Sequence, residues 1–230
     1  MTASTNTNAD PEIGKSVVAA GLATNYLEAG DGPPLLLIHG SGPGVTGYAN
    51  WRLNIPYFAK KFRVLAPDAA GFGYTERRPG MRYDLDTWVA HMIGFLDALG
   101  IEKTSVVGNS FGGALTVALV TRYPERFDRF VLMGAAGVEF ELTPGLDAVW
   151  GYTPSVANMR RLLDIFAYDR QLVTDELAEL RYRASIRPGV QESFAAMFPA
   201  PRQRGIEALA TDERRIAALG HRALICHGRD

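Results

Sequence analysis

The sequence has a single cysteine, no excess of charge of either sign and no long apolar run. The lone Cys226 cannot form a disulfide within the chain, and such cysteine usage is typical of the reducing cytoplasm, where we expect this protein. With 24 basic and 25 acidic residues the formal net charge is -1, so no basic surplus indicates a nucleic-acid partner. The apolar runs are far shorter than the ~20 residues that a membrane-spanning helix needs. We therefore expect neither a nucleic-acid nor a membrane partner.

The amino-terminal segment lacks the features of a targeting signal. Residues 1–10 are polar and contain neither a basic nor an apolar region, so we predict a disordered tail and not a signal peptide. The chain is 47% hydrophobic, and its 230 residues suffice for one domain with a large core and an insertion. The sequence shows no metal-binding or cofactor-binding motif, and we expect neither group.

Apolar segments of strand length alternate with helical segments along most of the chain. We predict a hairpin of two edge strands over 13–27 and further strands over 35–38, 63–66, 104–107, 129–133 and 222–226. We predict helices over 51–58, 86–99 and 114–120. This alternation implies an α/β fold in which a mainly parallel sheet is covered by helices on both faces. The ligand cleft of such a sheet lies at the carboxyl ends of its strands.

Between residues 138 and 210 the pattern changes to helical segments alone. The clearest of them are 156–166 and 174–186, and prolines at positions 154, 188 and 199 separate the segments. We predict a helical lid over 138–210, inserted into a core that consists of 11–137 and 211–230.

Residues 108–113, GNSFGG, connect a predicted strand to an apolar helix. A G-x-S-x-G sequence in this position is the nucleophile elbow of the α/β-hydrolase fold. The turn is tight, and the glycines at 108 and 112 remove side chains that would collide with neighbouring backbone. We predict Ser110 as the nucleophile and the backbone N–H of Phe111, at the positive end of the helix, as an oxyanion donor. Taken alone, the segment also fits a glycine-rich turn with an idle serine.

Two more loops are expected at the same edge of the sheet. Residues 39–44, HGSGPG, follow a predicted strand, and the backbone N–H of Ser41 is the predicted second oxyanion donor. His39 is predicted to anchor this loop, because in this fold the catalytic order along the chain is serine, acid, histidine. Asp68 lies among glycines and is predicted to form a turn. His91 lies off the apolar stripe of its helix and is predicted at the surface.

The sequence ends shortly after the predicted strand over 222–226. In α/β-hydrolases this strand leads into a G-x-x-D turn that carries the catalytic acid, and counting from Gly228 places that acid one position after Asp230. His221 and His227 precede this position, so neither is expected to be catalytic, and His227 is predicted to be packed. We therefore expect the last strand, its covering helices, the acid and the histidine to be missing from the 230 residues. Such a chain is expected to be inactive and poorly stable, because a serine without its base is a weak nucleophile and a bare sheet edge leaves backbone groups unpaired.

Four motifs together resemble the meta-cleavage-product hydrolases, which hydrolyse carbon–carbon bonds in bacterial aromatic catabolism. These motifs are residues 39–44, 50–52 (NWR), 108–113 and 180–182 (LRY). Residues 151–199 are most similar to the branch that acts on monocyclic substrates, which includes 2-hydroxymuconic semialdehyde hydrolase and 2-hydroxy-6-oxo-2,4-dienoate hydrolases.

The resemblance implies a reaction and a set of roles. A 2-hydroxy-6-oxo-2,4-dienoate would be ketonised and then cleaved to 2-hydroxypenta-2,4-dienoate and a carboxylic acid. Arg181 would bind the substrate carboxylate, and Asn50 and Asn109 would bind the 2-oxo or 2-hydroxy oxygen. Helical periodicity without the resemblance favours a solvated Arg181 on a charged helix. Three matters stay open: attack by Ser110 against activation of water, assembly into a homo-oligomer, and the acyl group, since Gly205 occupies a lid position where a bulky residue is expected.

Two other functions fit the same elbow. One is a carboxylic ester hydrolase, and the other is an inactive or ligand-binding hydrolase-like protein. The polar set of Arg181, Asn50 and Asn109 distinguishes the dienoate hydrolase from both. A dehalogenase of this fold needs a carboxylate at the elbow, and Ser110 argues against it.

Overall fold

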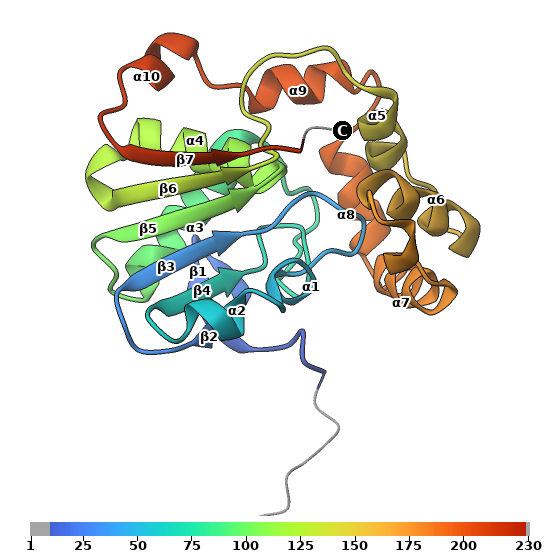
Figure 1. The fold of residues 1–230 in the computed structure, drawn as a ribbon, viewed down its shortest axis with the longest axis horizontal. Coiled ribbons are helices and arrows are strands. Elements are labelled where there is room, and N and C mark those ends of the chain that lie inside the picture. The colour runs from blue at the N-terminus through green and yellow to red at the C-terminus, as the bar shows by residue number, and fades with distance from the viewer. Residues whose placement is uncertain (1–9, 229–230) are drawn as a thin grey trace, which may run out of the picture.

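A computed structural model describes residues 10–228, and its strands form one seven-stranded sheet in the order β1-β2-β4-β3-β5-β6-β7 (Figure 1). The strands are β1 (Lys15–Ala19), β2 (Leu22–Ala29), β3 (Pro34–Ile38), β4 (Arg63–Pro67), β5 (Thr104–Asn109), β6 (Phe127–Met133) and β7 (Arg222–Cys226). The β1–β2 and β2–β4 pairs are antiparallel, and the remaining pairs are parallel. The predicted α/β fold with a mainly parallel sheet is confirmed.

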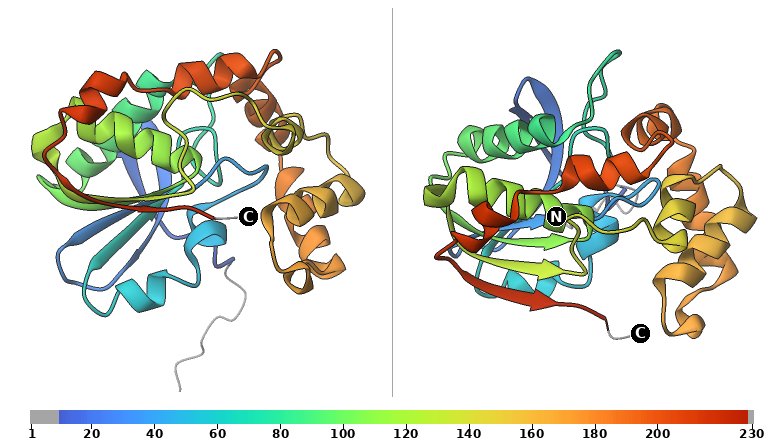
Figure 2. Two further views of the ribbon diagram at one scale, coloured as in Figure 1. Left: turned by 45° about the horizontal axis from the view of Figure 1, so that its top comes forward. Right: turned by 90° about the horizontal axis from the view of Figure 1, so that it is seen from above.

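Helices cover both faces of this sheet (Figure 2). The helices are α1 (Gly47–Trp51), α2 (Ile55–Phe58), α3 (Leu85–Ala98), α4 (Phe111–Arg122), α5 (Pro144–Trp150), α6 (Val156–Phe166), α7 (Asp175–Ser185), α8 (Val190–Met197), α9 (Gln203–Leu209) and α10 (Glu213–Ala217), with two short 3-10 helices, η1 (Pro124–Arg126) and η2 (Arg170–Leu172). Helices α3 and α4 pack on one face, and α1 and α2 pack on the other.

The continuous apolar run of β3 is explained by burial on two sides. Leu36 and Ile38 belong to the core under α3 and α4, whereas Leu35 and Leu37 belong to the smaller core under α1 and α2. Successive side chains of a strand point to opposite faces, so a strand covered on both faces needs apolar residues at every position. Trp51 closes the smaller core and is 1% exposed.

Capping side chains set where several helices begin. Ser155 Oγ accepts a hydrogen bond from Asn158 N–H at 3.0 Å at the start of α6, and Thr174 Oγ1 does the same for α7. The predicted single helix over 51–58 is wrong. Thr46 caps α1 earlier in the sequence, and α2 is a separate helix with a proline in its first turn.

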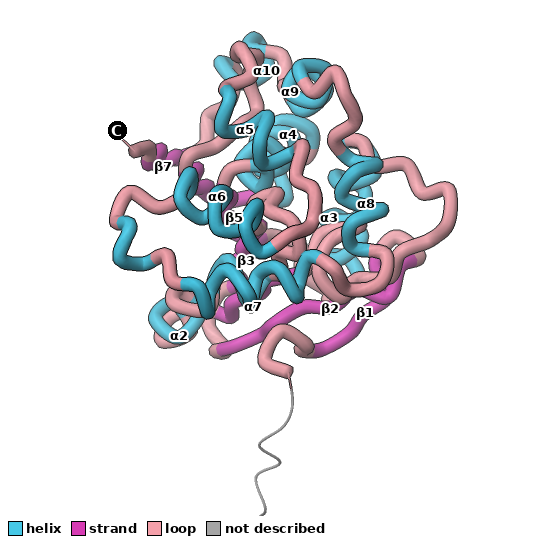
Figure 3. The backbone as a smooth tube through the Cα atoms, turned by 90° about the vertical axis from the view of Figure 1, so that its right-hand side faces the viewer, coloured by secondary structure: helices cyan, strands magenta, loops and turns pink. Residues whose placement is uncertain are grey.

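The chain between β6 and β7 forms helices, and we call residues 138–210 the inserted segment. Helices α5 to α8 lie beyond the carboxyl ends of the strands, and Figure 3 views the molecule from that side. The inserted segment is tied to the core by Ser193, whose Oγ donates to Gly71 O at 2.9 Å and accepts from Arg77 Nε at 3.1 Å. The segment therefore covers the edge of the sheet where the predicted functional loops emerge.

The hairpin and His91 differ from their predictions. β2 is not an edge strand, because it pairs with both β1 and β4. His91 is 1% exposed and not at the surface: its Nε2 lies 2.8 Å from Thr24 Oγ1, and its Nδ1 accepts from Ala70 N–H at 3.2 Å. Helix α3 is covered on two sides, by β1 and by α4. A single apolar stripe therefore underestimates its buried surface.

Several predictions concern the two ends of the described chain. Residues 1–9 of the predicted tail lie outside the described part, and Asp10, which is exposed, accepts a hydrogen bond from Tyr74 Oη at 2.5 Å. His227, predicted to be packed, is exposed, and so is Cys226. The acid and histidine expected after Asp230 lie outside the described residues. Between residues 10 and 228, no helix has the length and apolar character that crossing a membrane requires.

Candidate functional site

Ser110 sits in strained backbone geometry between β5 and α4. Its φ and ψ are 53° and -114°, a conformation that residues other than glycine rarely adopt. Backbone hydrogen bonds hold it there: Ser110 N–H donates to Met133 O at 3.0 Å, and Ser110 O accepts from the N–H groups of Gly113 and Ala136 at 2.9 and 3.1 Å. Strain of this kind persists only where the surrounding structure fixes the backbone, and strained residues are concentrated at functional sites.

The glycines of the elbow are required by close backbone approach. A Cβ at Gly108 would lie 2.2 Å from Gly112 O, and a Cβ at Gly112 would lie 2.3 Å from Ile38 O. A Cβ at Gly113 would lie 2.3 Å from Ala135 Cβ. All three positions exclude a side chain. The G-x-S-x-G spacing is thus explained by contacts with β3, with the loop after β6 and within the turn itself.

The loop after β3 lies beside the elbow because β3 and β5 are parallel neighbours, with Ile38 opposite Gly108. A Cβ at Gly40 would lie 3.4 Å from Ser110 Cβ, so the loop backbone passes directly over the serine. Ser41 is buried, and its Oγ accepts from Trp150 Nε1 at 3.1 Å. Phe111 is in the first turn of α4, where backbone N–H groups have no partner within the helix.

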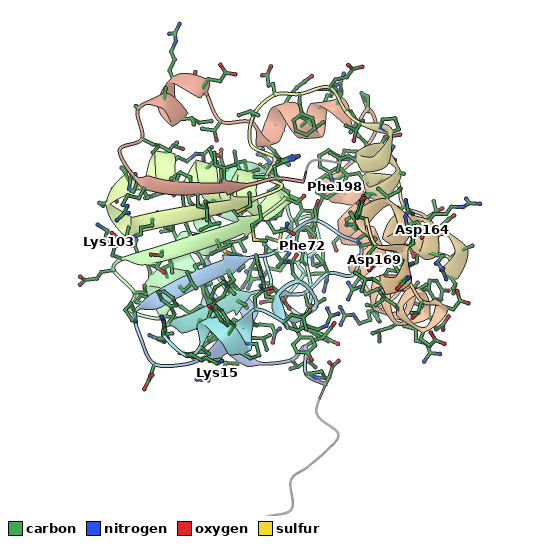
Figure 4. The ribbon with its side chains drawn as sticks, viewed as in Figure 1. Lys15, Phe72, Lys103, Asp164, Asp169 and Phe198 are labelled. Atoms are coloured by element: carbon green, nitrogen blue, oxygen red, sulfur yellow. The ribbon has the colours of Figure 1, made fainter. Side chains whose placement is uncertain are left out.

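His39 anchors this loop, as predicted. It is fully buried, its Nδ1–H donates to Gly40 O at 2.8 Å, and its Nε2 accepts from Ala69 N–H at 3.0 Å. Burial lowers the pKa of the imidazole, so the ring is neutral with both nitrogens occupied. The imidazole ring packs edge-on against the Phe72 ring, with the ring centroids 5.0 Å apart. Figure 4 shows Phe72 where the strands meet the inserted segment.

Asp68 forms a turn, as predicted, and it also joins three parts of the chain. Its Oδ1 accepts from Gly47 N–H at 2.6 Å, and its Oδ2 accepts from Asn25 Nδ2 and Tyr74 N–H at 2.8 Å each. A Cβ at Gly73 would lie 2.0 Å from Asp68 Oδ2. The carboxylate is therefore saturated by structural hydrogen bonds and is not positioned as a catalytic acid.

One cavity of about 500 Å³ brings together most of the predicted site. Its polar lining includes Ser41, Asn50, Asn109, Ser110 and Arg181. Its apolar lining includes residues of the inserted segment that the sequence interpretation missed: Leu146, Val149, Met159, Leu163 and Phe166. The helical spacing of the last three on α6 is the signal that would have found them.

Each of the two asparagines has one amide atom engaged and one available. Asn50 Oδ1 accepts from Gly40 N–H at 3.0 Å, and Asn109 Nδ2 donates to Met133 O at 3.1 Å. Within residues 10–228, the Asn50 NH₂ group and Asn109 Oδ1 have no further hydrogen-bond partner. The cavity thus offers one amide donor and one amide acceptor to a bound molecule.

Arg181 is largely buried, so the solvated arginine that periodicity favours is wrong. Its side chain is 15% exposed, Nη2 donates to Gly44 O at 2.9 Å, and Nη1 lies 3.6 Å from Glu12 Oε1. Burial lowers the pKa of the guanidinium, and the Glu12 carboxylate opposes this shift. The side chain connects α7 to the loop over the serine. A guanidinium keeps its charge even when desolvated, and it is a strong partner for a carboxylate.

Gly205 does not line the cavity. A Cβ at Gly205 would lie 3.1 Å from Trp150 Cζ3, and the Trp150 ring stacks on Phe198 with centroids 4.3 Å apart. The glycine therefore leaves room for the indole, whose Nε1–H reaches the buried Ser41. In the part of the chain that the structure describes, no three histidine, cysteine or acidic side chains are grouped to hold a metal ion.

Comparisons with known proteins agree on one family. The sequence model described as the alpha/beta hydrolase fold matches residues 33–226. The chain is 63% identical over 220 residues to the 2-hydroxymuconate semialdehyde hydrolase of Pseudomonas sp. (strain CF600), covering 96% of this chain and 78% of that protein. It is 58% identical over 224 residues to a 2-hydroxy-6-oxo-2,4-heptadienoate hydrolase of Pseudomonas putida, covering 97% of this chain and 81% of that protein.

The fold agrees equally well with a solved structure. The meta-cleavage product hydrolase CumD from Pseudomonas fluorescens IP01, solved as a serine-to-alanine mutant complexed with acetates, superposes with a TM-score of 0.95. It is 62% identical to this chain, and the match covers 96% of this chain and 81% of that one.

Proposed function

Since the chain belongs to the meta-cleavage product hydrolases of the α/β-hydrolase fold family, we propose that it hydrolyses a carbon–carbon bond of a 2-hydroxy-6-oxo-2,4-dienoate. The substrate is of the 2-hydroxymuconic semialdehyde type, and the products are 2-hydroxypenta-2,4-dienoate and a carboxylic acid. The reaction belongs to the degradation of aromatic compounds. The chemistry depends on Ser110.

The observation that carries the proposal is a single cavity lined by a nucleophile, a cationic group and apolar side chains. Ser110 and a largely buried Arg181 line the same cavity, and apolar side chains of α5 and α6 complete it. A dienoate has a carboxylate at one end and an uncharged carbonyl at the other. Its charge distribution therefore matches a cavity that combines a cationic group, a nucleophile and an apolar lining. The volume of about 500 Å³ lies within the range of small-molecule sites.

At the polar end, three side chains bind the 2-oxo acid portion of the substrate. Arg181 has a planar donor fork suited to a carboxylate. The Asn50 NH₂ group donates to a 2-oxo oxygen, and Asn109 Oδ1 accepts from a 2-hydroxy group. Both amides line the cavity that also holds Arg181 and the serine. The Asn50 donor favours the keto form, in which the 2-oxo group is an electron sink for the bond that breaks, whereas the Asn109 acceptor suits the 2-hydroxy form in which the substrate arrives.

At the serine, the distal carbonyl develops negative charge on its oxygen. The backbone N–H groups of Phe111 and Ser41 are the proposed oxyanion donors, and the amino end of α4 adds its positive dipole. Ketonisation moves the proton of the 2-hydroxyl to the carbon that will depart. In the cleavage the hydroxyl of water goes to the acyl carbon, the electron pair of the broken bond passes to the 2-oxo oxygen, and the proton of water is taken up there to give the 2-hydroxydienoate. Ser110 either attacks the carbonyl itself or activates the water, and both routes use the same donors.

We further propose that the inserted segment, 138–210, acts as a lid on a core made of 11–137 and 211–230. Its helices supply Arg181 and the apolar lining of the cavity. We also propose a cytoplasmic location, supported by the single cysteine among the 230 residues, which cannot form a disulfide within the chain.

The proposal is tested by turnover on matched substrates with the full chain, meaning the chain that includes the acid and histidine expected after Asp230. Dienoates with aldehyde, methyl-ketone and phenyl-ketone ends are followed by loss of the dienolate absorbance, and the products are identified by mass. We expect the aldehyde and methyl-ketone dienoates to be cleaved with a kcat/KM far above that for a p-nitrophenyl ester. Efficient ester hydrolysis without dienoate cleavage would show that the protein is a carboxylic ester hydrolase instead.

A further inference from the structure

Glu12 joins the amino-terminal segment of the core to helix α7 and its extension. Its Oε1 lies 3.6 Å from Arg181 Nη1, and its Oε2 lies 3.2 Å from Arg187 Nη1. The side chains of Glu12, Arg181 and Arg187 are 18%, 15% and 21% exposed, respectively. This is a largely buried cluster of one carboxylate and two guanidinium groups, and it adjoins the cavity at Arg181.

The backbone that carries Glu12 is held by the core and not by the inserted segment. Glu12 O accepts from Asn25 Nδ2 at 2.9 Å, and Gly14 N–H donates to Asn25 Oδ1 at 2.9 Å. Asn25 Nδ2 also donates to Asp68 Oδ2 at 2.8 Å. Asn25, in β2, thus fixes the backbone at residues 12 and 14, so the Glu12 carboxylate has a defined place relative to the sheet.

The salt bridges of this cluster are one carboxylate short, and the nearby Asp10 carboxylate is instead hydrogen-bonded to Tyr74 Oη. Among the described residues, one carboxylate pairs with two guanidinium groups here, and burial lowers the pKa of Arg181 because its charge is poorly solvated. The Arg187 guanidinium also lies over the Tyr74 ring at 4.1 Å, which provides part of its stabilisation. A substrate carboxylate in the cavity would supply the missing negative charge next to Arg181.

Arg181 has room to move away from the substrate. It lines the 500 Å³ cavity on one side and a second cavity of about 370 Å³ on the other, and the second cavity is also lined by Glu12 and Arg187. Two contacts restrict the guanidinium, one to Gly44 O and one to Glu12. Without the Glu12 contact a single hydrogen bond would remain, and ordering the side chain would cost binding energy when substrate enters.

We propose that Glu12 is a positioning residue for the dienoate reaction, acting through Arg181. Because the core fixes the backbone at Glu12, the Glu12 carboxylate restrains the Arg181 guanidinium. Arg181 is therefore already oriented toward the cavity before substrate binds. The inference rests on the proposed function, in which Arg181 binds the substrate carboxylate.

A double-mutant cycle in the full chain tests this. Glu12→Ala is expected to lower kcat/KM for the dienoate about tenfold, mainly through KM, and to change the value for a neutral p-nitrophenyl ester less than about twofold. Glu12→Gln should recover part of the loss, because its amide oxygen still accepts from a guanidinium. In an Arg181→Ala background, Glu12→Ala should have no further effect on the dienoate.

The matched control is Glu28, which also bridges two cations: it lies 2.8 Å from Lys15 Nζ and 2.6 Å from Arg63 Nε and is 13% exposed. Glu28→Ala should leave both substrates unaffected. Equal losses on both substrates for Glu12→Ala, a gain on the dienoate, or an undiminished effect in the Arg181→Ala background would each overturn the inference. If Arg181→Ala lowers kcat/KM equally for the dienoate and the ester, the proposed role of Arg181 fails, and the role of Glu12 fails with it.

Discussion

Ser110 has a φ of 53°, and backbone hydrogen bonds to Met133, Gly113, Ala114 and Ala136 hold it there. It lines the cavity at the amino end of α4. Arg181 reaches the same cavity from α7 and is 15% exposed. In the proposed reaction Ser110 attacks or activates water and Arg181 binds the substrate carboxylate, so substitutions at each should have different kinetic signatures.

Ser110→Ala in the full chain is expected to lower kcat on the dienoate by roughly a thousandfold or more, because it removes both nucleophilic attack and activation of water by this hydroxyl. Single-turnover absorbance measurements of dienoate loss provide the readout. The matched control is Ser105→Ala, a serine on the same strand that does not line the cavity. Near-normal turnover by Ser110→Ala would exclude both roles of the serine.

Arg181→Ala is expected to lower kcat/KM on the dienoate by an amount equivalent to about 2–5 kcal/mol, or roughly 30-fold to several-thousand-fold, since it leaves a buried carboxylate unpaired. The effect on a neutral ester should be small. Steady-state kinetics on both substrates measure this difference. Arg183→Ala is the control, because Arg183 lies on the same helix, is 73% exposed and pairs with Glu179 at 2.8 Å. Equal losses on both substrates would assign Arg181 a structural role through its bond to Gly44.

At the scale of elements, the strand–turn–helix unit of β5 and α4 depends on close backbone contacts. The turn passes β3 so closely that its glycines have no space for a methyl group. Helix α4 is buried along most of its length, so the turn cannot relax by moving the helix outward. A side chain added at one of these glycines would therefore have to displace atoms of the packed core.

Gly108→Ala is therefore expected to destabilise the protein by about 2 kcal/mol or more, because the new Cβ would lie 2.2 Å from Gly112 O. Urea-induced unfolding of the full chain, followed by fluorescence, measures the free energy of unfolding. Gly220→Ala is the control, since a Cβ there meets no atom within 4 Å. A Gly108→Ala variant as stable as the parent would show that the elbow has more freedom than these contacts imply.

At the scale of the whole molecule, His91 joins α3, β2 and the loop after β4. Burial lowers its pKa from 6.5 to about 4, so the folded protein keeps it neutral. The unfolded chain binds more protons than the folded one between these two values, and stability therefore rises with pH across this window. The contribution of His91 is complete above pH 6.5 and is lost as the pH falls toward 4.

When the pH falls from about 7 to about 5, we expect proton uptake by His91 in the unfolded chain to lower the free energy of unfolding by about 2 kcal/mol. Denaturant titrations at both pH values should show that the free energy of unfolding decreases less in His91→Gln than in the parent. His227→Gln, which replaces an exposed histidine, should not change the decrease. An identical pH dependence in the parent and His91→Gln would contradict the neutral, buried state of this imidazole.

Local patterns in the sequence were sufficient for the strands, for helices α3, α4, α6 and α7, and for the elbow. Apolar runs predict strands because both sheet faces are covered, and the G-x-S-x-G spacing reflects contacts within a few residues of Ser110 and with the adjacent strand. The bounds of α6 agree with the predicted helix over 156–166, where Ser155 caps the first turn. Such features are encoded locally, by side-chain periodicity and by the conformations that each residue permits.

Only the tertiary structure decided which charged and polar groups are buried. Arg181 lies on a helix with charged neighbours, and its burial depends on Gly44, 137 residues earlier in the chain. His91 is covered by a hairpin 67 residues away, at Thr24. Glu12 meets Arg187 across 175 residues. Helical periodicity describes one element at a time, whereas the solvation of a charge depends on every element packed against it, and that arrangement is set by the assembled fold.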